Sequence, residues 1–243
     1  QGEKVGWSLG DHEFFRQIVE KMSVLPKPFF TFLVSLSNHH PYDMIPNKYK
    51  ELELGHLEGT LIGNYLHSVH YADMALGVLF NELKEKGLYD DSLIVIFGDH
   101  DSGIPREDIE KLNIELPKVY EMFDKVPFIV HIPGSNHSEV YHEQTGHLDI
   151  APTVLHLLGI VPDNTFFMGR NLFAKNDDIV VFRNGSFIND RGVYIVNKSC
   201  FDPKNGEEIS GEVCSNGILN VSTRLNISDL IIKTNLIPEL RNN

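Results

Sequence analysis

The chain has little cysteine and a shortage of positive charge. Its 243 residues include 2 cysteines, and 21 Lys and Arg stand against 34 Asp and Glu, which gives a formal net charge of -13. A protein that binds nucleic acid is expected to present a basic face, so this balance argues against nucleic acid as a partner. The acidic residues are dispersed and indicate a solvated surface. An anionic substrate would therefore have to be held locally, by a metal ion and a few histidines.

Long apolar runs, internal repeats and low-complexity linkers are also lacking. No stretch approaches the roughly 18 apolar residues that span a bilayer, and no secretory leader is present. Because the chain begins with Gln1 rather than Met, we expect it to be a fragment, so these absences say little about the whole protein. With 42% hydrophobic and 23% charged residues, the chain is long enough for one sizeable core and a subordinate lobe.

The two cysteines, Cys200 and Cys214, lie in a polar stretch that contains glycine and is typical of a hairpin or loop. If they are oxidised, they close a short loop and contribute about 3 kcal/mol. Two free thiols are the alternative. The pair favours an extracytoplasmic location without settling it.

The most informative segment is 92–100, an apolar run that ends in Asp99 and His100. A strand this apolar is typical of the middle of a parallel sheet, and open α/β sheets bind their ligands just beyond the carboxyl ends of such strands. A carboxylate and an imidazole on adjacent residues can supply two ligands to one divalent cation, such as zinc or manganese. The alternative for this dipeptide alone is a helix N-cap Asp beside a surface His.

Helices and strands alternate over the first 160 residues. Apolar periodicity predicts helices over 11–25, with Asp11 as N-cap, and over 60–86, 116–123 and 149–158; it predicts strands over 29–36, 92–97 and 126–132. Strand, helix and strand at these lengths are typical of βαβ units with a parallel sheet.

Beyond Met168 the pattern changes to short strands. These are predicted over 179–182 and 193–196, with hairpin signals at Asn184-Gly185 and Asn205-Gly206. A C-terminal helix is predicted from about Ser228. The pattern therefore predicts that this part of the chain forms a small antiparallel annex.

Histidines occupy the places where ligands would bind. His39 follows the strand predicted over 29–36, as Asp99 and His100 follow the next, so we expect the three side chains to converge on one cleft at the sheet edge. His40 lies in the same loop as His39. His147, at a helix entrance, is a candidate metal ligand or phosphate contact.

Other polar residues near these places have structural explanations. Asp149 is best explained as a helix cap. His67 and His70 lie three residues apart on the long helix, a spacing that would allow a shared metal, but helix surface or core edge explains them better.

A set of blocks in this order resembles a known family. The blocks are Pro28-Phe29-Phe30, Ser37-Asn38-His39-His40-Pro41-Tyr42, Asn64-Tyr65, Tyr71-Ala72-Asp73, residues 87–92, Gly98-Asp99-His100, Val126-Pro127-Phe128-Ile129, residues 146–153 and Gly169-Arg170-Asn171-Leu172. Together they resemble the sulfatase and alkaline phosphatase superfamily, and within it the lipoteichoic acid synthases and their phosphoglycerol transferase relatives. The resemblance covers about Trp7 to Leu172.

The resemblance implies a three-layer α/β/α alkaline-phosphatase-like (sulfatase) fold, incomplete at the N-terminal side, with a small antiparallel C-terminal annex. Residues 1–175 would be the C-terminal portion of the catalytic domain, and residues 176–243 the annex packed on it. It further implies a metal-dependent transferase that moves phosphoglycerol from a lipid-linked donor to a polyol or glycan acceptor. Such an enzyme is anchored in the cell membrane through a region missing here, with an extracytoplasmic catalytic domain.

In that scheme Asp99 and His100 correspond to metal ligands. His147 stands where phosphatase-like members of the superfamily carry a further metal-binding histidine. His39 corresponds to the histidine that contacts the substrate phosphate or glycerol, and His40 is assigned to the substrate with it. Manganese is the expected ion, with zinc, magnesium or calcium as alternatives.

The resemblance also implies a threonine nucleophile upstream of this chain, because none of the threonines present fits its position. We therefore expect the isolated chain to bind divalent metal weakly and to turn over nothing. Two alternatives stay open. One is a sulfatase or phosphatase hydrolase of the same fold, which a histidine at position 147 favours; the other is a noncatalytic envelope-binding module.

Overall fold

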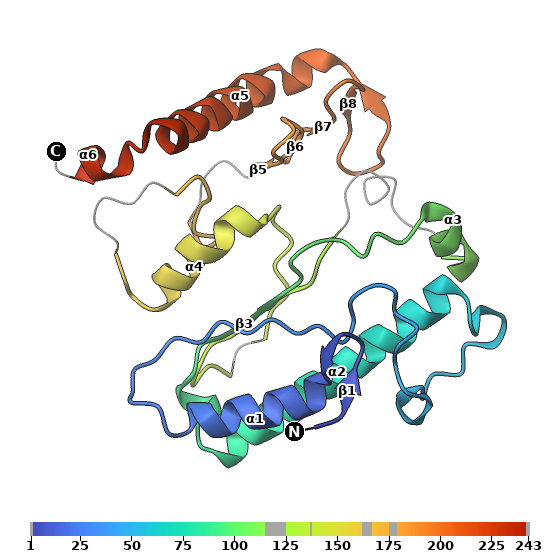
Figure 1. Cartoon of the computed structure of the whole chain (residues 1–243). Coiled ribbons are helices and arrows are strands. Elements are labelled where there is room, and N and C mark those ends of the chain that lie inside the picture. Colours follow the sequence, from blue (N-terminus) through green and yellow to red (C-terminus); the bar gives the residue numbers. More distant parts are fainter. Residues whose placement is uncertain (1, 115–124, 137, 162–166, 175–178, 242–243) are drawn as a thin grey trace. The chain divides into compact units, whose positions relative to one another are not determined.

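A computed structural model describes residues 2–114, 125–136, 138–161, 167–174 and 179–241 of the chain. The chain forms two compact units (Figure 1). The first comprises residues 1–115 and 128–135, and the second comprises 116–127 and 136–243. The boundary near residue 175 that the sequence suggests between catalytic portion and annex stays a prediction.

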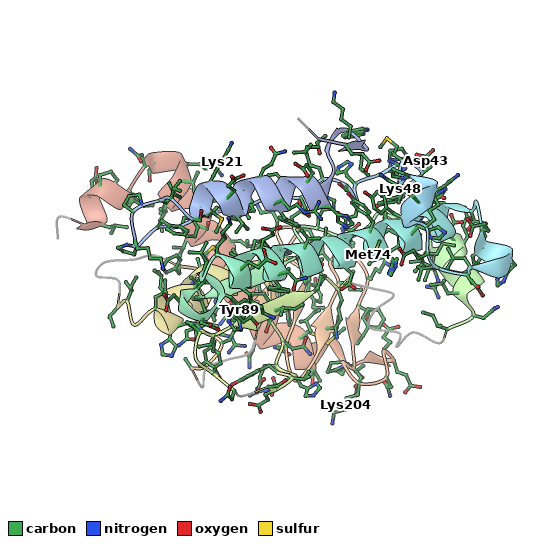
Figure 2. The ribbon with its side chains drawn as sticks, turned by 90° about the horizontal axis from the view of Figure 1, so that it is seen from below. Lys21, Asp43, Lys48, Met74, Tyr89 and Lys204 are labelled. Atoms are coloured by element: carbon green, nitrogen blue, oxygen red, sulfur yellow. A yellow bond between two sulfur atoms is a disulfide. The ribbon has the colours of Figure 1, made fainter. Side chains whose placement is uncertain are left out.

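The first unit is built on two helices that lie side by side, α1 (Asp11–Met22) and α2 (Leu61–Glu85) (Figure 2). Both helices were predicted and both are confirmed. Their apolar faces form one core, whose buried members are Phe15, Val19, Ala75, Leu79, Leu83 and Leu88. The side chain of Thr60 caps α2 by accepting a hydrogen bond from the backbone N–H of Gly63 at 3.1 Å.

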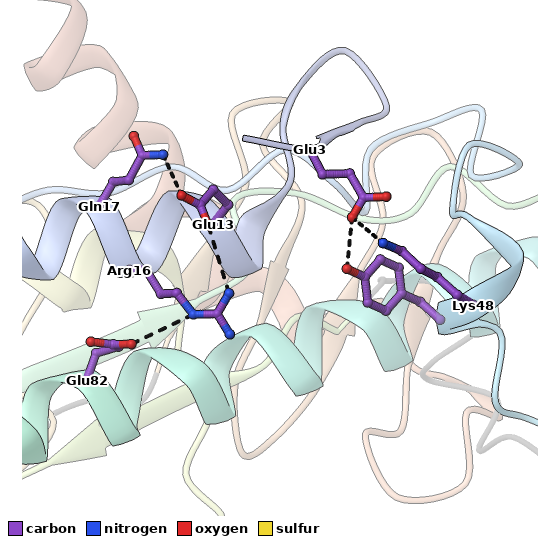
Figure 3. Close-up of polar contacts among 7 residues, drawn as sticks. Glu3, Glu13, Arg16, Gln17, Lys48 and Glu82 are labelled. Carbon is purple, nitrogen blue, oxygen red and sulfur yellow. Dashed lines mark hydrogen bonds and ion pairs between the residues drawn. The ribbon is translucent and has the colours of Figure 1, made fainter. Parts of the chain in front are cut away.

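Polar contacts connect the surface of these helices (Figure 3). Arg16 of α1 lies 3.8 Å from carboxylates of both Glu13 and Glu82, the latter on α2. Such exposed ion pairs contribute at most about 1 kcal/mol each, so the apolar core determines how the helices pack.

A small hairpin precedes α1. Its strands β1 (Lys4–Val5) and β2 (Ser8–Leu9) are antiparallel. Glu3 accepts hydrogen bonds from the Lys48 ammonium at 2.7 Å and the Tyr49 hydroxyl at 2.9 Å, and these bonds hold the hairpin to the turn η1 (Asn47–Tyr49) (Figure 3).

The strands β3 (Ile94–Phe97) and β4 (Phe128–His131) form where strands were predicted. They pair antiparallel, with Phe97 opposite Phe128 and Ile94 opposite His131, so the expected parallel arrangement is wrong for this pair. An apolar run indicates a buried strand but carries no information on the direction of its neighbour. Between them lie the short helices α3 (Arg106–Ile109) and η4 (Glu110–Leu112); the helix predicted over 116–123 lies outside the described residues.

The strand predicted over residues 29–36 does not form, because this segment pairs with no strand among the residues that the structure describes. Its side chains nonetheless alternate between packed and exposed positions. Phe29 and Leu33 pack against the core of α1 and α2, whereas Phe30, Phe32 and Val34 are 86%, 67% and 56% exposed. Alternation produces an extended segment, but a strand also requires a hydrogen-bonded neighbour.

The second unit contains α4 (Ile150–Leu157) and a five-stranded antiparallel sheet. The strands follow one another in chain order and are β5 (Val180–Val181), β6 (Phe187–Ile188), β7 (Val193–Tyr194), β8 (Cys200–Phe201) and β9 (Glu208–Ile209). The predicted turns at Asn184-Gly185 and Asn205-Gly206 connect neighbouring strands. The predicted antiparallel annex is thereby confirmed.

The helix α5 (Gly211–Thr234) packs on this sheet and is followed by α6 (Ile237–Arg241). It begins at Gly211, well before the predicted start near Ser228. Gly217 permits the close approach, because a Cβ there would lie 2.1 Å from the ring of Phe187. Cys200 of β8 and Cys214 of α5 form a disulfide, so the alternative of two free thiols is wrong.

Tyr71 of α2 makes the first unit sensitive to alkali. Its side chain is 1% exposed, and burial raises its pKa to about 12. A phenol in the unfolded chain ionises near pH 10, so the stability that the neutral ring provides is present below pH 10 and is lost as the pH rises to about 12.

We therefore expect Tyr71→Phe to reduce the loss of unfolding free energy between pH 10 and pH 12 by about 2 kcal/mol. Urea titrations at pH 10, 11 and 12 measure this difference, with Tyr194→Phe in the second unit as the control. Parallel stability curves for Tyr71→Phe and the unaltered chain would contradict the prediction.

Candidate functional site

Asp99 and His100 follow β3 directly, and their side chains are 78% and 65% exposed. The Nδ1–H of His100 donates to the carbonyl oxygen of Asp101 at 2.6 Å. This bond, and then the charge of Asp99, raises the pKa of His100 above its usual value. Asp99 caps no helix, because the next helix, α3, begins at Arg106 after Pro105. The alternative of an N-cap Asp is therefore wrong.

The arrangement of these two side chains suits one shared cation. A carbonyl oxygen only accepts, so the neutral imidazole of His100 carries its proton on Nδ1 and presents the lone pair of Nε2. This Nε2 lies 3.8 Å from Oδ2 of Asp99. Two ligand atoms about 2 Å from one metal ion lie roughly 3 to 4 Å apart. Among the described residues, however, no three His, Cys, Asp or Glu side chains form a metal cluster.

His39 lies in an exposed loop between residues 37 and 42. Its Nδ1–H donates to the carbonyl oxygen of His40 at 2.9 Å, which leaves Nε2 as the atom that can reach a ligand. The ring of Trp7, 67% exposed at the turn of the β1–β2 hairpin, lies 4.7 Å from the imidazole of His39. The ring of His40 lies edge-on to Tyr42 at 5.5 Å.

The loop of His39 and the loop of Asp99 and His100 are joined. The hydroxyl of Tyr42 donates to the carbonyl oxygen of Ser102 at 2.5 Å. Sequence reasoning expected the two loops to meet, on the assumption of parallel strands; here a tertiary hydrogen bond brings them together. The roles of the individual side chains stay predictions.

His147 belongs to the second unit, where it begins the short helix η6 (His147–Asp149) and is exposed. The adjacent Asp149 is buried, and its carboxylate accepts from the backbone N–H groups of Gly146 at 3.0 Å and Arg170 at 2.8 Å. Asp149 stands at the N-cap position of α4, as predicted, but its side chain makes no capping hydrogen bond to that helix and instead holds the turn before it. His147 as a metal ligand stays a prediction.

These contacts explain two of the sequence blocks, 146–153 and 169–172. Besides the bond from Arg170, the N–H of Leu172 donates to the hydroxyl of Thr153 at 3.1 Å. A Cβ at Gly169 would lie 1.9 Å from the carbonyl oxygen of Leu148, so only glycine fits there. The two blocks, 146–153 and 169–172, therefore pack directly against each other.

His67 and His70 bind different carboxylates. His67, 1% exposed, lies 3.3 Å from Glu58, and His70 lies 3.8 Å from Glu51. No metal cluster includes them among the described residues. The burial of His67 agrees with the core-edge position inferred from the sequence.

Sequence reasoning missed the roles of Trp7, Asp11 and Tyr42. Gly10, not Asp11, is the N-cap of α1. The buried Asp11 carboxylate instead accepts from the N–H groups of Leu36 and Ser37, both at 3.2 Å, at the start of the His39 loop. The single tryptophan of the sequence was the one local feature that could have drawn attention to Trp7. The contacts of Asp11 and Tyr42 span 26 and 60 residues, so no local pattern indicates them.

The comparison with family models matches residues 4–160 to the sulfatase family. The chain belongs to this family. Sulfatase-family membership accounts for the blocks between Trp7 and His147, and the solved structures similar to this chain have the predicted alkaline-phosphatase-like fold. The lipoteichoic acid synthase LtaP from Listeria monocytogenes has a TM-score of 0.78 and 26% identity, covering 95% of this chain and 61% of that one.

Two curated relatives are similar in sequence. Lipoteichoic acid synthase 2 of Bacillus subtilis is 34% identical over 243 residues, covering 95% of this chain and 36% of the relative. Lipoteichoic acid synthase of Staphylococcus saprophyticus is 36% identical over 208 residues, covering 83% of this chain and 32% of the relative. The chain thus spans about a third of the length of these relatives. In the part of the chain that is described, no helix meets the length and hydropathy needed to traverse a bilayer.

Proposed function

We propose that this chain is part of a metal-dependent phosphoglycerol transferase of the cell envelope. The observation that carries the proposal is the 34% identity with a lipoteichoic acid synthase over 95% of the chain. The enzyme would take phosphoglycerol from a lipid-linked donor and pass it to a polyol or glycan acceptor. The name of the relative supports both partners, because lipoteichoic acid is a polymer attached to a lipid.

The proposed location is the extracytoplasmic side of the cell membrane. The disulfide between Cys200 and Cys214 supports it, since disulfides persist in oxidising compartments and are rare in the cytosol. Attachment to the membrane is assigned to a region outside this chain.

Asp99 and His100 are proposed to hold the metal ion, with His147 as a further ligand. The local support is the 3.8 Å separation of the carboxylate and Nε2, and the Nδ1–H bond to Asp101 that fixes the ring. A bound divalent ion would polarise a phosphoryl oxygen and offset the charge that develops on it. Manganese is proposed first, with zinc, magnesium or calcium as alternatives.

His39 and His40 are proposed to contact the substrate. With Nδ1–H of His39 bound to a carbonyl, its Nε2 is placed to bond a phosphate oxygen or a glycerol hydroxyl. The nucleophilic threonine is assigned to the part of the protein upstream of this chain. We therefore propose that the chain carries part of the active site and is inactive alone.

A hydrolase of the same family is the second candidate, and the histidine at position 147 favours it, because the phosphatase-like members that the sequence resembles carry a metal-binding histidine there. One experiment separates the candidates. The whole protein is given vesicles of phosphatidylglycerol labelled in the headgroup, together with a glycolipid acceptor and Mn²⁺.

A transferase moves the label to the glycolipid, whereas a hydrolase releases it as free glycerol phosphate. We expect transfer, its loss on addition of a chelator, and its return with excess Mn²⁺. No consumption of the donor in any of these conditions would contradict both enzymes and favour the noncatalytic binding module.

A further inference from the structure

Tyr42 lies between the two loops of the proposed site. Its side chain is 5% exposed and packs in a small core cluster, with its ring 5.1 Å from that of Tyr65. Burial raises the pKa of its hydroxyl, which therefore stays protonated and able to donate at neutral pH. That hydroxyl donates to the carbonyl oxygen of Ser102, 60 residues along the chain.

The backbone of Tyr42 is in an unusual conformation for a bulky residue. Its φ is +65°, in the left-handed region that favours glycine. Strained residues of this kind persist where the surrounding contacts hold them, and they concentrate at functional sites. Here the contacts that hold the residue are the packed ring and the bond to Ser102.

The bond from Tyr42 ends next to the group that orients His100. Ser102 follows Asp101, whose carbonyl oxygen accepts the Nδ1–H of His100. The accepting carbonyls belong to successive residues, so fixing one restricts the other. On its other side, Tyr42 donates its backbone N–H to the carbonyl oxygen of His39 at 3.4 Å. One residue thus contacts both the proposed substrate loop and the proposed metal loop.

We propose that Tyr42 is a positioning residue that couples the loop of His39 to the loop of Asp99 and His100 and keeps His100 in its metal-binding orientation. The proposal rests on the proposed function, because it assigns Tyr42 to that same site. Groups that hydrogen-bond a metal ligand directly change metal affinity or activity by about 10- to 100-fold. Tyr42 acts on His100 through the backbone of Asp101 and Ser102, so we expect an effect at the lower end of that range.

The test measures the affinity of the whole protein for Mn²⁺ by isothermal titration, and transfer at limiting and saturating Mn²⁺. Tyr42→Phe keeps the ring and removes the hydroxyl. We expect its Mn²⁺ affinity to fall by about 10-fold, and its transfer activity to recover at saturating Mn²⁺. Because bound metal also stabilises the folded chain, thermal unfolding of each variant without metal is measured in parallel, and we expect Tyr42→Phe to be folded in the absence of Mn²⁺.

Tyr71→Phe is the matched control, because it removes a hydroxyl from another buried tyrosine of the first unit, 1% exposed. Its Mn²⁺ affinity should equal that of the unaltered protein. If Tyr42→Phe fails to fold, Tyr42→Met replaces it, because methionine has an adaptable apolar side chain. We expect the same loss of Mn²⁺ affinity from Tyr42→Met.

Unchanged Mn²⁺ affinity in either Tyr42 variant would overturn the proposal, and so would lost activity that saturating Mn²⁺ does not restore. A failure of the proposed function has a different signature. In that case the unaltered protein itself would bind no Mn²⁺ or would move no label from the donor, whatever the Tyr42 variants do.

Discussion

Replacement of Asp99 by Ala is expected to lower phosphoglycerol transfer by the whole protein about a thousandfold. The reason is that a metal ion contributes several kcal/mol of charge stabilisation in the transition state, and each 1.36 kcal/mol is a factor of ten in rate. The carboxylate of Asp99 lies 3.8 Å from the Nε2 of His100, where both can reach one ion. Initial rates with the labelled donor, and Mn²⁺ affinity by isothermal titration, measure the effect.

The same reasoning predicts that His100→Ala lowers the transfer rate by a comparable factor. The double replacement should lower the rate little further than the more harmful single replacement, because the effects of residues that act as a unit are not additive. Asp90→Ala is the matched control: it removes the same charge from an exposed position of the first unit, at the short helix η3 (Tyr89–Asp91). Transfer by Asp99→Ala at the rate of Asp90→Ala would remove Asp99 from the proposed metal site.

The helices of the first unit were predictable because their information is local. The apolar spacing in α1 and α2 places Phe15 and Val19 opposite Ala75 and Leu79, and these residues do form one core. The hairpin turns of the second unit were equally predictable, because Asn-Gly sequences favour the tight turns of antiparallel strands.

Features set by distant partners could not be predicted. The direction of β4 beside β3 and the absence of a partner for residues 29–36 both depend on neighbours in space. The start of α5 was missed for a related reason. Its first turns contain Gly211 and Gly217, which are poor helix formers, and packing on Phe187 outweighs that weak propensity.

For the candidate site, the sequence predicted that Asp99 and His100 follow a strand, as they do after β3, but the strand expected before His39 does not form. The sequence did not predict what holds the two loops together. Strand-end placement indicated ligands, and this argument needs only the nearest residues. The bond from Tyr42 to Ser102 and the bonds from residues 36 and 37 to Asp11 join segments far apart in sequence, so no local pattern encodes them.

Removal of the disulfide is expected to destabilise the second unit by about 3 kcal/mol. Cys200 and Cys214 are 14 residues apart and each is 1% exposed, between β8 and α5. Without the bond, the unfolded chain regains the freedom of that loop, and the contact between sheet and helix loses its covalent link. We expect Cys200→Ala with Cys214→Ala to raise amide hydrogen exchange in β6 and β7 about a hundredfold, since 1.4 kcal/mol is a factor of ten.

Two controls assign this effect to the bond. Trp7, the one tryptophan in the sequence, lies in the first unit, so its fluorescence reports the unfolding of that unit separately. A reducing agent should reproduce the exchange increase in the unaltered chain and do nothing further to the double variant, because the latter has no bond to reduce. An exchange rate in β6 and β7 that stays the same after reduction would mean that the packing of Phe187 against Gly217, rather than the disulfide, holds α5 on the sheet.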